Sequence, residues 1–169
     1  MKFKNEVVYI QRLLKETKIK EIMTVPVVKI YEYEAVSRAE ELFVQQGIYY
    51  LPVVNRLDQL IGIITHKYLY KTLAPRKVIA GNYMGYSNEM VIDGNFFYDK
   101  TTLDSFRLKD IMHLNPLTLS PEDSIAEAVL TMTRHNTGCI PIVKGNKKVC
   151  GMLTHKDIVN LATLILLDY

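Results

Sequence analysis

Two nearly identical heptapeptides carry the side chains of this chain that could hold a ligand. Residues 62–68 read GIITHKY and residues 151–157 read GMLTHKD, so the two copies differ most in their last residue, Tyr68 against Asp157. A carboxylate can accept hydrogen bonds from both hydroxyls of a vicinal diol, as acids do at nucleotide sites. Asp157 is therefore a candidate for binding a ribose.

The same residues also allow a purely structural interpretation. Thr154 and Asp157 are spaced as in a capping box, in which a hydroxyl and a carboxylate satisfy the first turn of a helix. In the first copy Thr65 keeps the capping oxygen, and the sequence after Tyr68 still favours a helix. The acid is not needed to make the fold, and both interpretations remain open.

A His-Lys pair follows the threonine in each copy, at residues 66–67 and 155–156, in the first turn of the expected helix. A cation at this position is opposed by the helix dipole, at a cost of roughly 0.3–1 kcal/mol. A bound anion would reverse that cost, because free backbone N–H groups and the lysine would converge on it. We hypothesise that Lys156 contacts a phosphate; the alternative is that His155 and Lys156 simply point into water.

No other arrangement typical of catalysis or metal binding is visible in the sequence. It contains no Ser/His/Asp or Cys/His arrangement, no P-loop and no GxGxxG after a strand, and His113 and His135 stand alone. Cys139 and Cys150 flank an expected hairpin without metal-ligand spacing, so we expect reduced packing thiols. We expect no enzyme, no metal site and no required cofactor.

The two heptapeptides belong to a longer internal repeat. IKEIMTV at residues 19–25 recurs as LKDIMHL at residues 108–114, and the copies keep an offset of 89 positions, as from Gly62 to Gly151. Hydrophobic periodicity predicts a β-α-β-β-α unit of ~55 residues in each copy. The expected strands are residues 27–30, 51–54 and 60–64 in the first copy and 117–119, 140–143 and 149–153 in the second, each last strand being followed by a helix.

The rest of the chain divides around these repeats. We expect an amphipathic helix at residues 1–17, the repeats at 18–73 and 107–169, and a linker at 74–106. The linker is longer than compact domains usually need and carries an aromatic cluster and a possible Asp-Gly hairpin in the stretch VIDGNFF. It could be a lid, a partner surface or a mobile connection.

Composition narrows the class of protein. The 169 residues include 21 basic and 18 acidic side chains in mixed order, with a net charge of +3, so no basic stripe of the nucleic-acid-binding type appears. The apolar stretches are far shorter than the ~20 residues that cross a bilayer. We expect a soluble, cytoplasmic protein with neither a membrane nor a nucleic acid as partner.

The ordered motifs, I-M, then P, then an amphipathic helix, then P-V-V or P-I-V, then G-h-h-T-x-x-[D/Y] with h an apolar residue, occur twice. This order resembles the cystathionine-β-synthase (CBS) domain, and the tandem copies resemble a CBS pair, or Bateman module. The resemblance covers about residues 18–73 and 107–162. It implies an α+β fold of two pseudo-symmetric repeats packed sheet to sheet, with an N-terminal helix and a long linker between the repeats.

The resemblance also implies a function. Such pairs are regulatory modules that bind adenosine-containing ligands (AMP, ADP, ATP or S-adenosylmethionine) in clefts between the repeats, and they commonly form homodimers. A regulated partner protein is possible. The alternative is a ligand-free scaffold that dimerises or docks a partner through the aromatic linker.

Site residues carried over from the resemblance fall into two clefts. Asp157 would hold the ribose and Thr154 would face phosphate, and the adenine contacts would come from Asn115, Leu117, Thr118, Cys139, Ile140 and Pro141. From their place in the first turn of the expected helix, and not from the resemblance, His155 and Lys156 are added to this cleft. The second cleft would comprise Thr65, Lys67, Tyr68, Tyr50 and Val27, and it departs from the pattern because Tyr68 replaces the acid. Cys139 and Tyr50 stand where a basic residue often precedes the proline, which indicates weaker phosphate binding or a less charged ligand.

Overall fold

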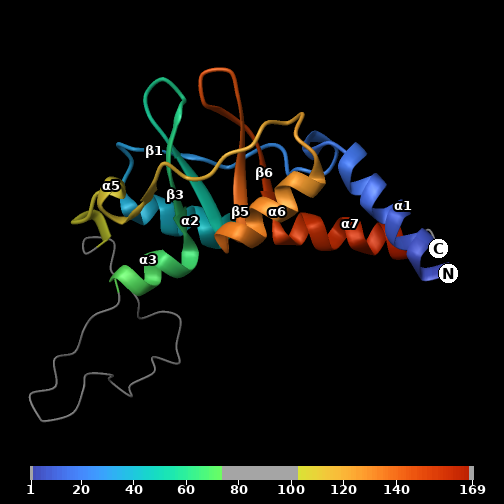
Figure 1. Cartoon of the computed structure of the whole chain (residues 1–169). Coiled ribbons are helices and arrows are strands. Elements are labelled where there is room, and N and C mark those ends of the chain that lie inside the picture. Colours follow the sequence, from blue (N-terminus) through green and yellow to red (C-terminus); the bar gives the residue numbers. More distant parts are fainter. Residues whose placement is uncertain (1, 74–102, 168–169) are drawn as a thin grey trace, which may run out of the picture.

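The computed structural model describes residues 2–73 and 103–167 (Figure 1). The first part of the chain contains, in order, α1 (Lys2–Glu16), the 3-10 turn η1 (Ile19–Glu21), β1 (Ile30–Tyr31), α2 (Val36–Gln46), β2 (Tyr50–Val54), β3 (Leu60–Thr65) and α3 (His66–Leu73). The second repeat contains α5 (Leu108–Ile111), β4 (His113–Leu114), α6 (Ile125–His135), β5 (Cys139–Lys144), β6 (Lys148–Thr154) and α7 (His155–Leu167).

Each repeat is built around one antiparallel hairpin. In the first, β2 pairs with β3 and Tyr50 lies opposite Thr65; in the second, β5 pairs with β6 and Cys139 lies opposite Thr154. A helix follows each hairpin directly, α3 from His66 and α7 from His155. The predicted α+β class and the helices after the threonines are confirmed.

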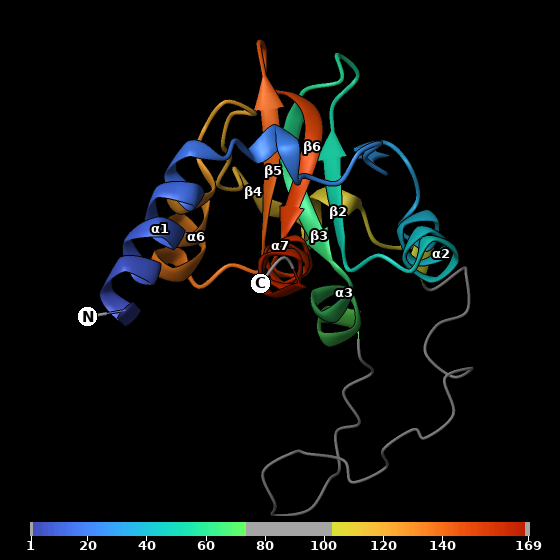
Figure 2. The same ribbon diagram turned by 90° about the vertical axis from the view of Figure 1, so that its right-hand side faces the viewer.

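The predicted N-terminal helix is also confirmed. Helix α1 lies alongside α6 of the second repeat (Figure 2). Leu14 packs against the buried core that contains Ile125 and Ile140. The amphipathic sequence of α1 thus covers the second repeat, although it precedes the first in the chain.

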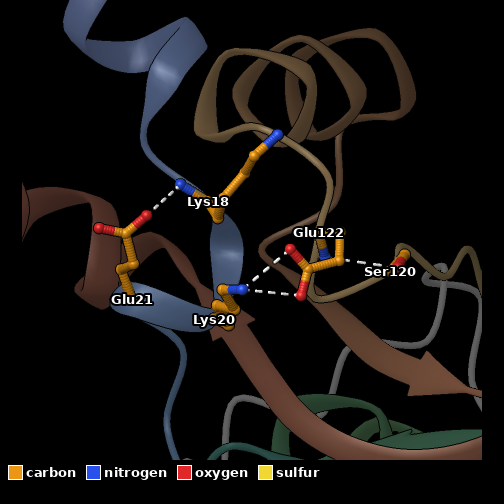
Figure 3. A network of polar contacts seen from close by, with 5 residues as sticks. All are labelled: Lys18, Lys20, Glu21, Ser120 and Glu122. Atoms are coloured by element: carbon orange, nitrogen blue, oxygen red, sulfur yellow. Dashed lines mark hydrogen bonds and ion pairs between the residues drawn. The ribbon is translucent and has the colours of Figure 1, made fainter.

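The segment that leads into each repeat packs on the opposite repeat. Ile19 is fully buried in the core of the second repeat, whereas Leu108 and Ile111 are buried in the core of the first. Outside these cores, the ammonium group of Lys20 contacts both carboxylate oxygens of Glu122, at 2.8 and 2.9 Å (Figure 3). The two repeats therefore exchange their leading segments.

Strand pairing follows the same exchange. Strand β4 of the second repeat extends the sheet of the first, with His113 opposite Ile63, and the order of that sheet is β1-β2-β3-β4. At the equivalent place Thr24 pairs with Met152 through the bonds Thr24 N–H to Met152 O (2.8 Å) and Met152 N–H to Thr24 O (3.1 Å).

The predicted first strands are shorter than expected. Of residues 27–30 only Ile30 belongs to a strand, and residues 117–119 make only a single bridge, from Leu119 to Ile142. The reason is the exchange of leading segments. Before the chain reaches Ile30, Thr24 forms a bridge to β6 in the other repeat, and Val27 packs against buried side chains between the two hairpins. These residues therefore cross from one sheet to the other.

The two hairpins meet at the centre of the molecule. Ile63, Cys139 and Met152 are buried together, and Tyr50 packs against them. Burial raises the pKa of the Cys139 thiol to about 12, and Cys150 is partly buried. This sheet-to-sheet contact agrees with the expected arrangement of the repeats.

Two further expectations concern the linker and the membrane. Residues 74–102, with the aromatic cluster and the VIDGNFF stretch, lie outside the described residues; Leu103, at the end of the expected linker, is buried in the first core. Among the residues described, no helix combines the length and the apolar character that crossing a bilayer requires.

Candidate ligand-binding cleft

A cavity of about 460 Å³ opens where the two repeats meet. Its walls come from residues 24–28, here called the crossing segment of the first repeat, from the connection between α2 and β2, and from the junction between β6 and α7. The lining residues are Thr24, Pro26, Val27, Val28, Gln46, Gly47, Ile48, Tyr49, Tyr50, Gly138, Met152, Thr154, His155 and Lys156. A volume in the range ~300–1,000 Å³ is typical of small-molecule sites.

The lining of this cavity is mainly apolar and aromatic. Its polar groups are few: threonine and tyrosine hydroxyls, the amide of Gln46, the imidazole of His155 and the ammonium of Lys156. None of the described residues that line the cavity carries a carboxylate. Such a surface suits a flat, largely apolar ring system that carries a small number of hydrogen-bonding groups.

Asp157 lies immediately behind this lining. Its Oδ2 accepts hydrogen bonds from the Thr154 N–H and from the Thr154 hydroxyl, both at 2.7 Å. Because Asp157 occupies the first turn of α7, these bonds satisfy the start of the helix. The capping role that the sequence left open is thus present in the structure.

The other oxygen of the same carboxylate reaches across the repeats. Asp157 Oδ1 accepts a hydrogen bond of 3.0 Å from the hydroxyl of Thr24, which belongs to the crossing segment of the first repeat. Thr24 and Thr154 both line the cavity, so the carboxylate sits between two lining residues.

The equivalent place beside α3 has a different chemistry. There Tyr68 and His113 stand at the positions of Asp157 and Thr24, at the offset of 89 residues, and their rings lie 4.5 Å apart. Thr65 caps α3 by accepting a hydrogen bond of 3.1 Å from the Tyr68 N–H. The threonine is kept in both repeats, although in the second its hydroxyl donates to Asp157, whereas the pair that bridges the repeats changes from polar groups to rings.

The two histidines that follow the threonines also differ. The ring of His66 meets Phe43 and Tyr49 edge-on, at centroid distances of 5.3 and 6.0 Å. Desolvation lowers the pKa of His66, against a smaller opposing effect of Glu40. His155, in contrast, is exposed and lines the cavity.

Tyr50 and Gly138 form the tight part of the lining. A Cβ atom added to Gly138 would overlap the hydroxyl of Tyr50 and lie 3.6 Å from Nδ1 of His155. Burial raises the pKa of Tyr50, with a further contribution from Cys139. Any larger residue at position 138 would therefore force the Tyr50 side chain to shift.

The structure groups the expected site residues differently from the sequence. Thr154, His155 and Lys156 share one cavity with Val27 and Tyr50, which were expected in the second cleft. The physical reason is the exchange, which brings the crossing segment of the first repeat to the helix start of the second. Whether these residues bind a ligand stays a prediction.

The remaining expected residues do not line this cavity. Asn115, Leu117 and Thr118 are exposed in the crossing segment of the second repeat, and Cys139, Ile140 and Pro141 are buried in β5. Asn115 N–H donates to Ile61 O at 3.3 Å, so that segment lies beside β3 of the first repeat. Thr65, Lys67 and Tyr68 lie at the junction of β3 and α3, where Tyr68 contacts the same segment through His113.

Several lining residues were missed by the sequence analysis, among them Thr24, Ile48, Tyr49, Gly138 and Met152. One signal was available: Tyr49 and Gly138 occupy equivalent positions of the repeat, one residue before Tyr50 and Cys139. No cluster of His, Cys, Asp or Glu suited to a metal ion occurs in the part of the chain that the structure covers.

Two relatives resemble most of this chain in sequence over part of their own length. The chain is 26% identical to homoserine O-acetyltransferase of Methanococcus vannielii over 155 residues, 92% of this chain and 27% of that protein. It is 23% identical to L-aspartate semialdehyde sulfurtransferase of Methanocaldococcus jannaschii over 145 residues, 86% of this chain and 23% of that protein. The chain thus spans about a quarter of these relatives.

Two solved CBS structures match over nearly their full length. A CBS domain pair in complex with 5′-methylthioadenosine and S-adenosylmethionine is 22% identical, with a TM-score of 0.67 over 87% of this chain and 96% of that chain. CBSX2 in complex with AMP is 20% identical, with a TM-score of 0.65 over 88% of this chain and 97% of that chain. These likenesses concern the fold.

The family model of the CBS domain matches the chain twice, at residues 19–75 and 108–163. The two matches coincide with the two hairpin-and-helix units and their exchanged leading segments. The chain therefore belongs to the CBS domain family and is a tandem CBS pair.

Proposed function

We propose that this chain is a regulatory module that binds an adenosine-containing ligand in the cavity between its two CBS repeats. One observation carries the proposal: the start of α7, with Thr154, His155 and Lys156, faces an apolar and aromatic wall from the first repeat across a cavity of about 460 Å³. A nucleotide needs both sides, an apolar slot for the base and polar groups for the sugar and phosphate.

Proteins of the same fold support this choice of ligand. One CBS pair is solved with 5′-methylthioadenosine and S-adenosylmethionine, and another with AMP. All three ligands contain adenosine. We extend that shared part, the adenosine, to this chain.

Each part of the ligand has a proposed contact. Asp157 accepts from the ribose hydroxyls, and Lys156 with the N-terminus of α7 binds an anionic group. The base lies among the apolar side chains of the wall, which include Val27, Ile48 and Met152.

The charge of the lining favours an anionic ligand over a cationic one. Lys156 contributes a positive charge to the lining, whereas the carboxylate of Asp157 lies behind the lining and is bonded to Thr24 and Thr154. AMP should therefore bind more tightly than S-adenosylmethionine, whose sulfonium is positive. Because one lysine and one histidine serve the anion, added phosphates of ADP and ATP should bring little further affinity.

A thermal-shift panel of AMP, ADP, ATP, S-adenosylmethionine and NAD tests the proposal. A ligand at 100 times its Kd should add ~2.7 kcal/mol to the stability, which is several degrees in Tm. Lys156→Ala should weaken AMP binding and its dependence on salt. Lys67→Ala, at the equivalent exposed position of the first repeat, is the matched control and should leave both unchanged. No shift with any ligand would contradict the proposal.

Regulation would follow from contacts with both repeats. A ligand shifts an equilibrium only if it binds one arrangement more tightly than another. The cavity has walls from both repeats, so a bound ligand responds to how they are packed. Changes in that packing would pass to a partner protein or a second copy of the chain.

Dimerisation without a ligand is a second candidate function, and one observation favours it. No residue of α7 is buried, and Val159, Leu164, Leu166 and Leu167 are 60–77% exposed. A helix this apolar is usually covered by a protein surface. Light scattering on the wild type and Leu164→Glu should show a dimer and its loss; a monomeric wild type would exclude this candidate.

A further inference from the structure

The acceptor capacity of Asp157 is nearly used up by the protein itself. Oδ2 accepts two hydrogen bonds from Thr154, and Oδ1 accepts one from the hydroxyl of Thr24. A carboxylate has about four lone-pair positions, two on each oxygen. The three bonds therefore leave room for one further donor, on Oδ1.

A ribose offers two adjacent hydroxyls. If both donate to Asp157, as the proposed function requires, one of the three present donors has to leave. This further step rests on the proposed function and concerns which protein donor gives way.

Thr24 is the donor that is easiest to release. The two bonds from Thr154 are 2.7 Å long and cap α7. One of them comes from the main-chain N–H of Thr154, which cannot rotate away as a hydroxyl can. The bond from the Thr24 hydroxyl is longer, at 3.0 Å, and Thr24 is exposed. Water can therefore accept the hydrogen bond of this hydroxyl in place of Asp157. The backbone of Thr24 stays in place because it exchanges two hydrogen bonds with Met152.

We propose that the Thr24 hydroxyl competes with the ribose for Asp157, and that ligand binding displaces it. Thr24 is a positioning residue, since it acts on the ligand through Asp157. The bond that is lost joins the two repeats across 133 positions of the chain. Ligand binding thereby removes a direct side-chain link between the repeats, which couples occupancy of the cavity to their packing.

The test compares two nucleotides on three proteins by isothermal titration calorimetry. AMP carries both ribose hydroxyls, whereas 2′-deoxy-AMP carries one and fits the remaining acceptor position without displacing Thr24. Thr24→Val removes the competing hydroxyl with little change in shape. It should raise the affinity for AMP about fivefold, the effect of one hydrogen bond. Its affinity for 2′-deoxy-AMP should change less than about twofold, so that the preference for the diol widens.

Thr24→Ser restores the hydroxyl and should return both affinities to the wild-type values. Thr24→Ala is a second variant without the hydroxyl, should Thr24→Val fold poorly. The proposal is overturned if the variants without the hydroxyl bind AMP more weakly than the wild type, or if both nucleotides change by the same factor. The proposed function fails separately, if the wild type binds neither nucleotide.

Discussion

The side chain of Met23, in the first repeat, lies directly over the main chain of Gly151 in the second. A Cβ atom added to Gly151 would overlap the sulfur of Met23 and lie 2.9 Å from its Cγ. The same relationship holds in reverse for Met112 and Gly62. The methionine of the I-M motif and the glycine of the heptapeptide are therefore partners across the exchange of leading segments.

Gly151→Ala should destabilise the protein by about 1–3 kcal/mol, because the added methyl group overpacks the site and Met23 has to move. Urea denaturation measures the effect. In a Met23→Ala background the same change should cost less, since the space is already vacated. Equal costs in both backgrounds would contradict the contact between these residues.

The second cleft, at Tyr68, should become able to bind AMP if it is given the polar pair of the Asp157 cleft. Tyr68→Asp with His113→Thr places an acid and a hydroxyl at the positions of Asp157 and Thr24. Wild-type protein should bind one AMP per chain, because the ring of Tyr68 contacts His113 where the acid would lie. The double variant should bind two. Calorimetric stoichiometry measures both, and two molecules on the wild type would refute this account of the second cleft.

His66 should make stability depend on pH. Desolvation lowers its folded-state pKa below the value of 6.5 that is usual for histidine. The unfolded chain therefore takes up a proton at a higher pH than the folded protein does. The stability contributed by neutral His66 is present above about pH 6.5 and is lost as the pH falls through the folded pKa.

Tm values of the wild type and His66→Gln should therefore converge as the pH is lowered from 7.5 to 5.5. The two proteins share every other titrating group, so their difference isolates His66. A difference that stays constant or widens toward pH 5.5 would contradict the lowered pKa.

Cys139 should not react with thiol reagents in the folded protein. Its pKa of about 12 leaves almost no thiolate at pH 8, and the thiolate is the reactive form. A Cys150→Ser variant isolates Cys139. It should be labelled by Ellman's reagent only after unfolding in guanidinium chloride, and rapid labelling of the native variant would show that the thiol is accessible.

Much of the fold followed from periodicity and the repeat, because these features are local. The spacing of apolar residues predicts α2 and α6, and Thr65 and Thr154 mark the starts of α3 and α7. The crossing segments are harder to predict from sequence, since a short apolar run such as residues 27–30 can lie within a sheet or between two sheets. Their position depends on contacts such as Met23 with Gly151, which are distant in sequence.

The site was predictable in its types of residue and not in its grouping. The start of α7, with Thr154 and Asp157, is recognisable in the sequence. The wall that faces it comes from the other repeat, so Val27 and Tyr50, which the sequence places in the second cleft, line the same cavity as Thr154. A repeat shows which positions are equivalent, and it does not show whether the copies exchange segments.

Calorimetric titration of AMP into the wild type, Asp157→Ala and Asp123→Ala tests the central claim most directly. Asp123 is a matched control, because it is a carboxylate of the same repeat that accepts a backbone hydrogen bond of 2.7 Å, from Ser120 N–H, and does not line the cavity. Both variants lose a structural hydrogen bond of this kind, which costs ~1 kcal/mol of stability. Binding of AMP to the wild type and to Asp123→Ala, with its loss in Asp157→Ala, is the result predicted for a ribose held by Asp157. Equal affinity in all three proteins would contradict it.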